Sequence, residues 1–189
     1  KDAAERFVRS VEKELKFLDM PNVILNVALN PCKMNRFGQE TAEFMISTNL
    51  GEPPKPMSKI ASGGELSRIM LAIKNVLADK DRIPTMIFDE IDTGVSGRAA
   101  QKIGLKLKEV SHNKQVICVT HLAQIAALAD KHLLIEKKTK KDRTFTEVTD
   151  LDFEGRKREV ARIMGTGQMT DLLLRNAEDL IRNGQELTK

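Results

Sequence analysis

The sequence predicts an α/β fold with a parallel sheet core that is flanked by helices and extended by antiparallel strands. Apolar runs at 85–88 and 115–120 enclose a segment whose apolar residues recur at helical spacing. This strand, helix, strand order is typical of a parallel sheet. Two further short runs, at 133–136 and 144–149, have no helical pattern between them and favour an antiparallel hairpin.

The chain opens with a charged segment whose sparse apolar residues follow the 3.6-residue period, at Phe7, Val8, Val11, Leu15 and Leu18. This spacing predicts a helix over 1–18. Because the pattern begins abruptly, we expect it to be the end of a longer arm helix, with residues 19–189 forming the globular part.

Two strands and a loop are expected next. Met20-Pro21 breaks the helix, and apolar residues favour strands at 23–29 and 43–48. Residues 49–56 contain three prolines and a glycine. Such a segment cannot easily continue a sheet, so it predicts a loop.

The central segment carries the strongest helical patterns. A helix is expected after Ser62-Gly63-Gly64-Glu65 and runs to Leu77, followed by a strand at 85–88 and a glycine-containing turn at 93–97. The next helix spans 99–110 and leads into the strand at 115–120, which ends at His121. In a parallel sheet, ligands bind at the carboxyl ends of the strands.

The final part of the chain is expected to contain the hairpin and two helices. The segment 137–143 forms a basic tip between the two strands. The helices are predicted at 154–164 and 170–183, with Gly165 and Gly184 as their stops.

Composition limits the class of protein. The 189 residues carry a formal net charge of +4, which permits contact with nucleic acid without requiring it. No apolar stretch approaches the length of about 20 residues that crosses a bilayer, and the opening residues lack a secretory pattern. We therefore expect a cytoplasmic protein with no membrane partner. Cys32 and Cys118 lack metal-site spacing, which favours reduced thiols.

Ser62-Gly63-Gly64-Glu65 is a candidate anion site. Two residues without side chains directly before a helix let backbone N–H groups and the positive end of the helix dipole approach a phosphate. The alternative is a plain capping box, because Ser62 and Glu65 also match S-x-x-E. The two interpretations are compatible.

Two adjacent acids follow the strand at 85–88. Asp89 is suited to hold Mg²⁺ through water, and Glu90 is suited to orient or deprotonate a water that attacks a phosphate. The alternative is an acidic strand end that opens a turn.

His121 and Asp92 are candidates from the same edge. An imidazole after a strand could contact a terminal phosphate, although a lone histidine is more often structural. Asp92, with Thr93 and Gly94, would form a turn near Glu90, and simple turn chemistry is its alternative.

Taken in order, these motifs resemble the signature, Walker B, D-loop and switch-histidine elements of ABC ATPases, and within them the chromosome-maintenance, SMC-like branch. Ala61 before Ser62, and Ile91-Asp92-Thr93-Gly94 in place of a Pro-Thr-Ser loop, favour that branch over transporters. The resemblance implies the C-terminal lobe of an ATPase head over 19–189, with 1–18 as the stub of its coiled coil.

The resemblance also implies cofactors, roles and partners. ATP and Mg²⁺ would be bound, Asp89 would stand on the metal side, Glu90 would be the catalytic carboxylate and His121 the γ-phosphate sensor. Ser62, Gly63, Gly64 and Glu65 would act in trans on ATP held by a second head, and Asp92 would communicate across that dimer. The expected function is ATP-driven DNA double-strand-break repair and recombination, close to the nucleoid.

One required element does not occur in these residues. No G-x-x-x-x-G-K-[ST] is present, so this chain alone is expected to be inactive and to need an N-terminal Walker A half of the same protein. The alternatives are a transporter's nucleotide-binding subunit, which the Asp-Thr-Gly loop disfavours, and a non-hydrolysing ATP-dependent clamp, which Glu90 disfavours.

Double-stranded DNA is the expected macromolecular partner. The basic tip residues could neutralise backbone phosphates; they are Lys137, Lys138, Lys140, Lys141 and Arg143. The alternative is a solvated turn. With no Trp or Tyr, a base-stacking platform is disfavoured.

Overall fold

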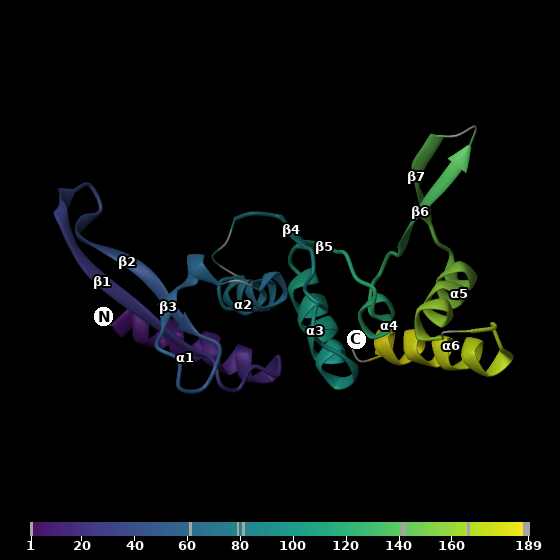
Figure 1. The fold of residues 1–189 in the computed structure, drawn as a ribbon, viewed down its shortest axis with the longest axis horizontal. Helices are drawn as coiled ribbons and strands as arrows, with labels where there is room; N and C mark the ends of the chain where they lie inside the picture. The colour runs from purple at the N-terminus through teal and green to yellow at the C-terminus, as the bar shows by residue number, and fades with distance from the viewer. Residues whose placement is uncertain are drawn as a thin grey trace. The chain divides into compact units, whose positions relative to one another are not determined.

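A computed structural model describes residues 2–60, 62–78, 80, 82–140, 143–165 and 167–186 (Figure 1). The chain divides into two compact units. The first unit contains residues 1–94 and 113–119, and the second contains 95–112 and 120–189. None of the described helices is long and apolar enough to cross a membrane.

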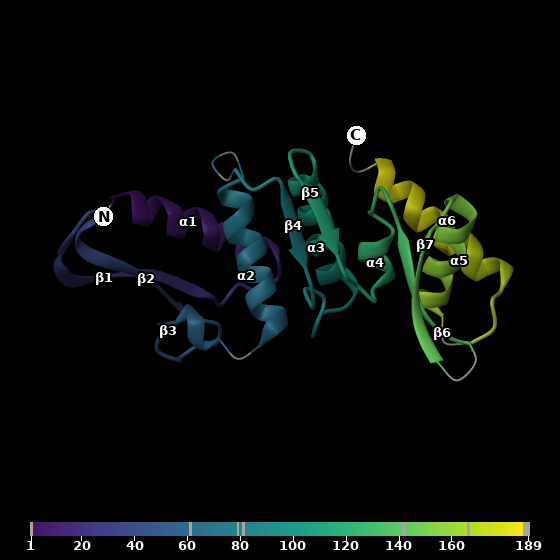
Figure 2. The same cartoon turned by 90° about the horizontal axis from the view of Figure 1, so that it is seen from above.

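The first unit begins with helix α1 (Asp2–Phe17), which packs on strand β1 (Ile24–Asn35) and on a later helix, α2 (Gly63–Val76) (Figure 2). Val11 and Leu15 of α1 are fully buried. The expected helix is therefore confirmed, and its apolar stripe is a core contact. The boundary between an arm at 1–18 and a head at 19–189 stays a prediction.

A long hairpin follows, in which β1 pairs antiparallel with β2 (Gly38–Ser47). Both strands are longer than predicted, because the distal half of the hairpin is exposed on both faces and shows no apolar alternation. The loop prediction for 49–56 is wrong at its end, where β3 (Lys55–Pro56) pairs with β2. A proline is tolerated there because β3 is an edge strand.

The parallel sheet of the first unit consists of β4 (Thr85–Phe88) and β5 (Gln115–Cys118), in register from Thr85↔Gln115 to Phe88↔Cys118. A short 3₁₀ turn, η1 (Met57–Lys59), precedes α2. The predicted helix after Ser62-Gly63-Gly64-Glu65, the predicted strand at 85–88 and its parallel pairing with the next strand are confirmed. The second strand is shorter than expected, so His121 does not close it but follows after Val119 and Thr120.

The second unit is built from helices around a small-residue core. Its elements are α3 (Gly97–Ser111), α4 (Ala123–Ala126), β6 (Leu133–Lys140), β7 (Arg143–Asp150), α5 (Phe153–Met164) and α6 (Asp171–Glu186). The core residues are Ala123, Ala126, Ala127, Val160, Ala161, Ala177 and Ile181. The single-turn helix α4 has no periodic sequence signal and was not predicted.

Two details of this unit differ between the sequence patterns and the structure. Gly165 caps α5 as expected, but Gly184 lies inside α6 and does not end it. A Cβ at Gly184 would lie 3.1 Å from Cδ2 of Leu128, so this glycine permits close packing. The predicted basic tip at 137–143 is also too long, because β6 and β7 pair from Leu133↔Asp150 to Lys140↔Arg143.

Together the two units confirm the α/β class. A parallel strand pair with helices and two antiparallel hairpins matches the predicted mixture. The elements that carry the candidate site, α2, β4 and the loop after β4, all lie in the first unit.

Candidate functional site

The N-terminus of α2 is fixed by Ser62. Its backbone is extended, with φ −92° and ψ 117°, and its Oγ accepts a hydrogen bond from the backbone N–H of Glu65 at 3.3 Å. The Ser62 half of the expected capping box is therefore confirmed. The first backbone N–H groups of α2, including those of Gly63 and Gly64, have no partner within the helix, so an anion could bind them.

Because Gly63 and Gly64 lack side chains, the loop that follows β4 can pack closely against the start of α2. A Cβ on Gly63 would lie 2.5 Å from Oε2 of Glu90, and a Cβ on Gly64 would lie 2.9 Å from the carbonyl oxygen of Thr93. The second contact is with backbone and leaves no room for any side chain. The Gly-Gly pair thus brings the start of α2 against residues 90–93.

The two acids after β4 have different neighbours, and both lie beyond the end of the strand. Oδ1 of Asp89 accepts a hydrogen bond from the backbone N–H of Glu90 at 2.9 Å. The carboxylate of Glu90 instead lies over Gly63. Both residues are exposed, and Glu90 has a φ of +57°. The loop therefore presents two accessible carboxylates with separate surroundings.

Ser67 and Arg68 join α2 to the same loop and were not singled out from the sequence. Oγ of Ser67 donates to the carbonyl of Asp89 at 3.0 Å. Nη1 of Arg68 donates to the carbonyls of Ile91 at 3.3 Å and Thr93 at 2.9 Å. Arg68 is only 7% exposed. The sequence does contain a signal for this contact, because Arg68 directly precedes the apolar Ile69 within a helix that is expected to be buried. A buried charge needs specific partners.

Burial controls the protonation of two groups here. Desolvation lowers the pKa of Arg68, and the nearby Glu65 carboxylate opposes this shift. Burial, followed by the charges of Asp92 and Asp89, raises the pKa of the Cys118 thiol to about 12. Cys118 therefore stays protonated at neutral pH and is a poor nucleophile. Asp92 is 2% exposed, so its carboxylate is a buried part of the loop.

His121 belongs to the second unit. It is exposed and precedes Leu122, the N-cap residue of α4. The structure thus brings together Ser62, the glycines, Asp89 and Glu90 in the first unit, while the role of His121 as a phosphate sensor stays a prediction.

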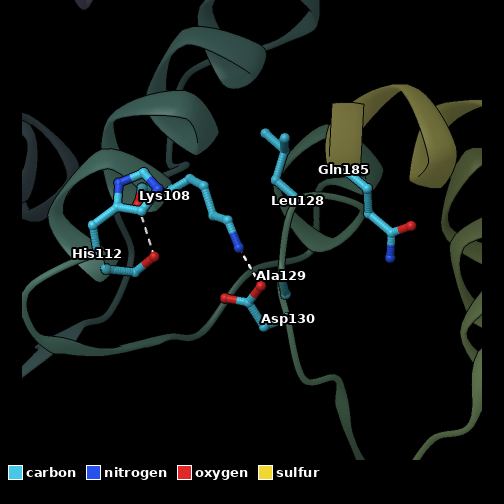
Figure 3. A pocket seen from close by; sticks show the side chains of 7 residues that line it. Lys108, His112, Leu128, Ala129, Asp130 and Gln185 are labelled. Carbon is cyan, nitrogen blue, oxygen red and sulfur yellow. Dashed lines mark hydrogen bonds and ion pairs between the residues drawn. The ribbon is translucent and has the colours of Figure 1, made fainter. Parts of the chain in front are cut away.

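Each unit also contains a shallow pocket. One of about 230 Å³ reaches Ser62 and Glu65 and is also lined by Lys55 and Lys59. The other, of about 360 Å³, lies in the second unit between the end of α3 and α6 (Figure 3). There Lys108 forms an ion pair with Asp130. The second pocket contains none of the predicted site residues.

The described basic residues of the β6–β7 hairpin lie on its strands. Lys137, Lys138 and Arg143 are exposed. Lys138 forms ion pairs with Glu147 and, at 3.9 Å, with Glu136, and its hydrogen bond to Glu147 raises its pKa. Lys140 ends β6, and Lys141 lies outside the described residues, as does Ala61.

The sequence is similar to curated DNA-repair proteins, although no family model matches it. It is 46% identical over 157 residues to the DNA repair protein RecN of Bacillus subtilis, a match that covers 83% of this chain and 27% of the relative. It is 42% identical over 188 residues to RecN of Treponema pallidum, covering 96% of this chain and 33% of the relative. The chain thus spans about a third of the length of these relatives.

The fold is similar to solved SMC heads. A Pyrococcus yayanosii Smc head domain with a coiled coil and joint aligns with a TM-score of 0.60 at 21% identity, over 85% of this chain and 29% of that one. A second structure, from work on ATP-driven dimerization and DNA-stimulated activation of SMC ATPases, aligns at 0.52 and 21% identity, over 88% of this chain and 96% of that one. The fold is therefore similar to that of solved SMC head domains.

Proposed function

Since this chain belongs to the RecN family and spans about a third of its members' length, we propose that it is the C-terminal half of an ATP-binding and hydrolysing head that acts in DNA double-strand-break repair and recombination. The relatives carry the name DNA repair protein. The head is proposed to work in the cytoplasm, close to the nucleoid.

The observation that carries this proposal is the junction between α2 and the loop after β4. A glycine-fronted helix start and two exposed carboxylates meet there, with Glu90 over Gly63. A helix N-terminus suits phosphate, and carboxylate oxygens suit Mg²⁺, which usually keeps several waters. The helix start therefore fits the phosphates of one ATP, and the carboxylates fit the Mg²⁺ that accompanies another, so that the junction supplies part of each of the two sites in a head dimer. Bound Mg²⁺ would neutralise charge that develops on the phosphates.

Each residue is assigned one role in that reaction. Asp89 would hold Mg²⁺ through water, and Glu90 would orient and deprotonate the water that attacks the terminal phosphate. His121 contacts the terminal phosphate. The helix start, Ser62 to Glu65, binds ATP held by a second head, and Asp92 communicates across that dimer.

The Walker A half of the same protein is the proposed covalent or assembled partner, because it would supply the phosphate-cradling loop. The β4–β5 sheet supports this partner. Ile87 is 70% exposed and its register partner Ile117 is 45% exposed. Since parallel sheets are normally covered on both faces, this apolar face suits another layer of the head.

Two other functions are less well supported. A transporter subunit is disfavoured by the similarity to RecN and by the Asp-Thr-Gly loop. A clamp that binds ATP without hydrolysis would have no need of a carboxylate at the position of Glu90.

The deciding experiment measures ATP turnover by the assembled head, this chain with its Walker A half, with and without linear double-stranded DNA at low and moderate salt. Turnover that rises with DNA, and loses that rise as salt increases, supports the proposal. Turnover that ignores DNA contradicts the DNA-dependent part, and no turnover contradicts the ATPase.

A further inference from the structure

We propose that Ser67 and Arg68 are positioning residues that make α2 and the loop at 89–94 move as one body, so that a phosphate bound at Ser62–Gly64 resets the catalytic loop of the same chain. The proposal rests on the proposed ATPase function. Three hydrogen bonds, from Ser67 to the carbonyl of Asp89 and from Arg68 to the carbonyls of Ile91 and Thr93, form the helix–loop bonds.

The helix–loop bonds hold the loop by its backbone. Ser67 holds the carbonyl of Asp89, and Arg68 holds those of Ile91 and Thr93. Three carbonyls in five consecutive residues are thus bonded to adjacent side chains on the second turn of α2. A displacement of α2 must therefore move the loop or break these three bonds, two of which are donated by the buried Arg68.

The glycine contact restrains the loop a second time, from the first turn of the helix. A Cβ on Gly64 would lie 2.9 Å from the carbonyl oxygen of Thr93 and 3.2 Å from that of Glu90. Backbone thus packs directly on backbone at this point. Gly64 and Arg68 lie one turn apart on the same face of α2, and both contact the carbonyl oxygen of Thr93. The loop is therefore restrained at this oxygen by packing as well as by a hydrogen bond.

The burial of Arg68 argues against a purely space-filling role. Removing a guanidinium from water is costly unless its donors are satisfied. Nε of Arg68 finds no hydrogen-bond partner among the described residues, so the burial is not fully compensated. An apolar side chain would fill the same position more cheaply, but it could not hold two loop carbonyls.

The bonded residues connect two functions. Arg68 bonds the residues on either side of Asp92, and Ser67 bonds the residue before Glu90. The start of α2 faces one nucleotide of a head dimer, whereas Asp89 and Glu90 act on the other. The helix–loop bonds therefore couple the two nucleotide sites through a single chain.

The test compares Arg68→Ala, Arg68→Lys and Ser67→Ala in the assembled head, with turnover measured against ATP concentration. We expect Arg68→Ala to lower kcat by roughly 3- to 30-fold, the span of typical coupling effects, and to reduce the Hill coefficient toward one. Arg68→Lys, whose side chain ends in a single ammonium group, should restore part of kcat and part of the Hill coefficient. Ser67→Ala should change them in the same direction by less.

Arg156 provides a matched control in the second unit. It is 6% exposed, donates to the carbonyls of Ala127 at 3.4 Å and Ala129 at 2.6 Å, and its Nε also finds no partner among the described residues. Arg156→Ala should lower thermal stability as much as Arg68→Ala while it keeps the Hill coefficient. Equal loss of cooperativity in both variants, or none in Arg68→Ala, overturns the proposal.

Amide hydrogen exchange separates failure of this proposal from failure of the proposed function. The N–H of Thr93 donates to the carbonyl of Glu90 at 3.1 Å. Its exchange rate therefore measures how often the loop opens, and the measurement needs no nucleotide. Faster exchange at 89–94 in Arg68→Ala and Ser67→Ala supports the helix–loop bonds even in a head that does not hydrolyse ATP. Unchanged exchange at 89–94 in both variants overturns the proposed role of the helix–loop bonds. If Arg68→Ala does not fold, the exchange rates of Ser67→Ala alone test the proposal.

Discussion

Glu90 combines an exposed carboxylate with a backbone φ of +57°. This left-handed conformation is uncommon for residues other than glycine and asparagine, and it costs on the order of 1 kcal/mol. Strain of this kind persists where surrounding structure determines it, often at functional sites. Here the bond from its N–H to Asp89 and the bond from Thr93 to its carbonyl determine it.

The role of Glu90 is tested by Glu90→Gln, which keeps the shape of the side chain and removes its basicity. In the assembled head, turnover should fall by roughly 10²- to 10⁴-fold, the range for general-base catalysis. ATP should still close the head dimer, as measured by size-exclusion chromatography with light scattering. Unchanged turnover would remove Glu90 from the reaction.

The two glycines should respond differently to alanine. In Gly64→Ala the new Cβ meets backbone of the loop, so we expect a loss of roughly 1–3 kcal/mol in the free energy of unfolding, as for other overpacked sites. In Gly63→Ala the Cβ meets only the end of the Glu90 side chain, which can rotate away, so the free energy of unfolding should change by less than about 1 kcal/mol. Urea denaturation of both variants checks this order, and equal losses would contradict it.

His132 should make stability depend on pH. Burial, and then the charge of Arg156, lower its pKa below the ordinary value of 6.5, while Glu159 opposes them. Its Nδ1 is buried and has no hydrogen-bond partner among the described residues. Because the unfolded chain binds this proton more readily, the stabilisation is complete above the unfolded pKa and is lost as pH falls from there toward the folded pKa.

The measurement is urea denaturation from neutral pH down to about pH 5, starting above the ordinary histidine pKa. His132→Asn should flatten the dependence on pH, whereas the exposed His112→Asn should keep it. A wild-type chain whose stability does not fall over this interval would contradict the assignment.

At the scale of elements, the sequence predicted those in which one face is buried. Of the apolar residues that predicted α2, Ile69 and Ile73 are buried, and the run at 85–88 is β4. Leu71 is also buried, although it lies outside the predicted stripe. The ends of the β1–β2 and β6–β7 hairpins were missed because exposed strands carry no burial pattern. The helix–loop bonds were missed for another reason. They join residues 22 to 25 positions apart, and only the tertiary fold brings these together.

The β6–β7 hairpin permits a test of DNA contact with an internal comparison. Lys138 is already paired with Glu147 and Glu136, whereas Lys137 and Arg143 are exposed on the same hairpin. If the hairpin contacts phosphates, Lys137→Gln with Arg143→Gln should lower the salt dependence of double-stranded DNA binding by about two, one for each phosphate contact. Lys138→Gln should change it by less. Fluorescence anisotropy across a salt series measures these slopes, and wild-type slopes in both variants would exclude the hairpin.

At the scale of the whole molecule, the exposed apolar face of the β4–β5 sheet supports the proposed Walker A partner. Met86 and Phe88 are buried, while Ile87 and Ile117 face outward in register. Burial of apolar surface contributes about 25 cal/mol per Å², so two such residues form a useful centre for an interface. A Walker A half that covers them would also bring its phosphate loop into the same head as Asp89 and Glu90.

Ile87→Thr with Ile117→Thr tests this assembly, because threonine keeps the β-branched shape and the strand preference but removes apolar area. The free energy of unfolding of the chain alone should change little at position 87, since Ile87 is 70% exposed, and modestly at position 117, since Ile117 is 45% exposed. Co-purification with the Walker A half should weaken by roughly tenfold or more, because burial of two aliphatic side chains contributes about 1.5–3 kcal/mol each. Met34→Thr is the matched control, as Met34 is 77% exposed on β1. If Met34→Thr weakens assembly as much as the paired change, the β4–β5 face is not the specific contact, and the Walker A half must bind this chain elsewhere.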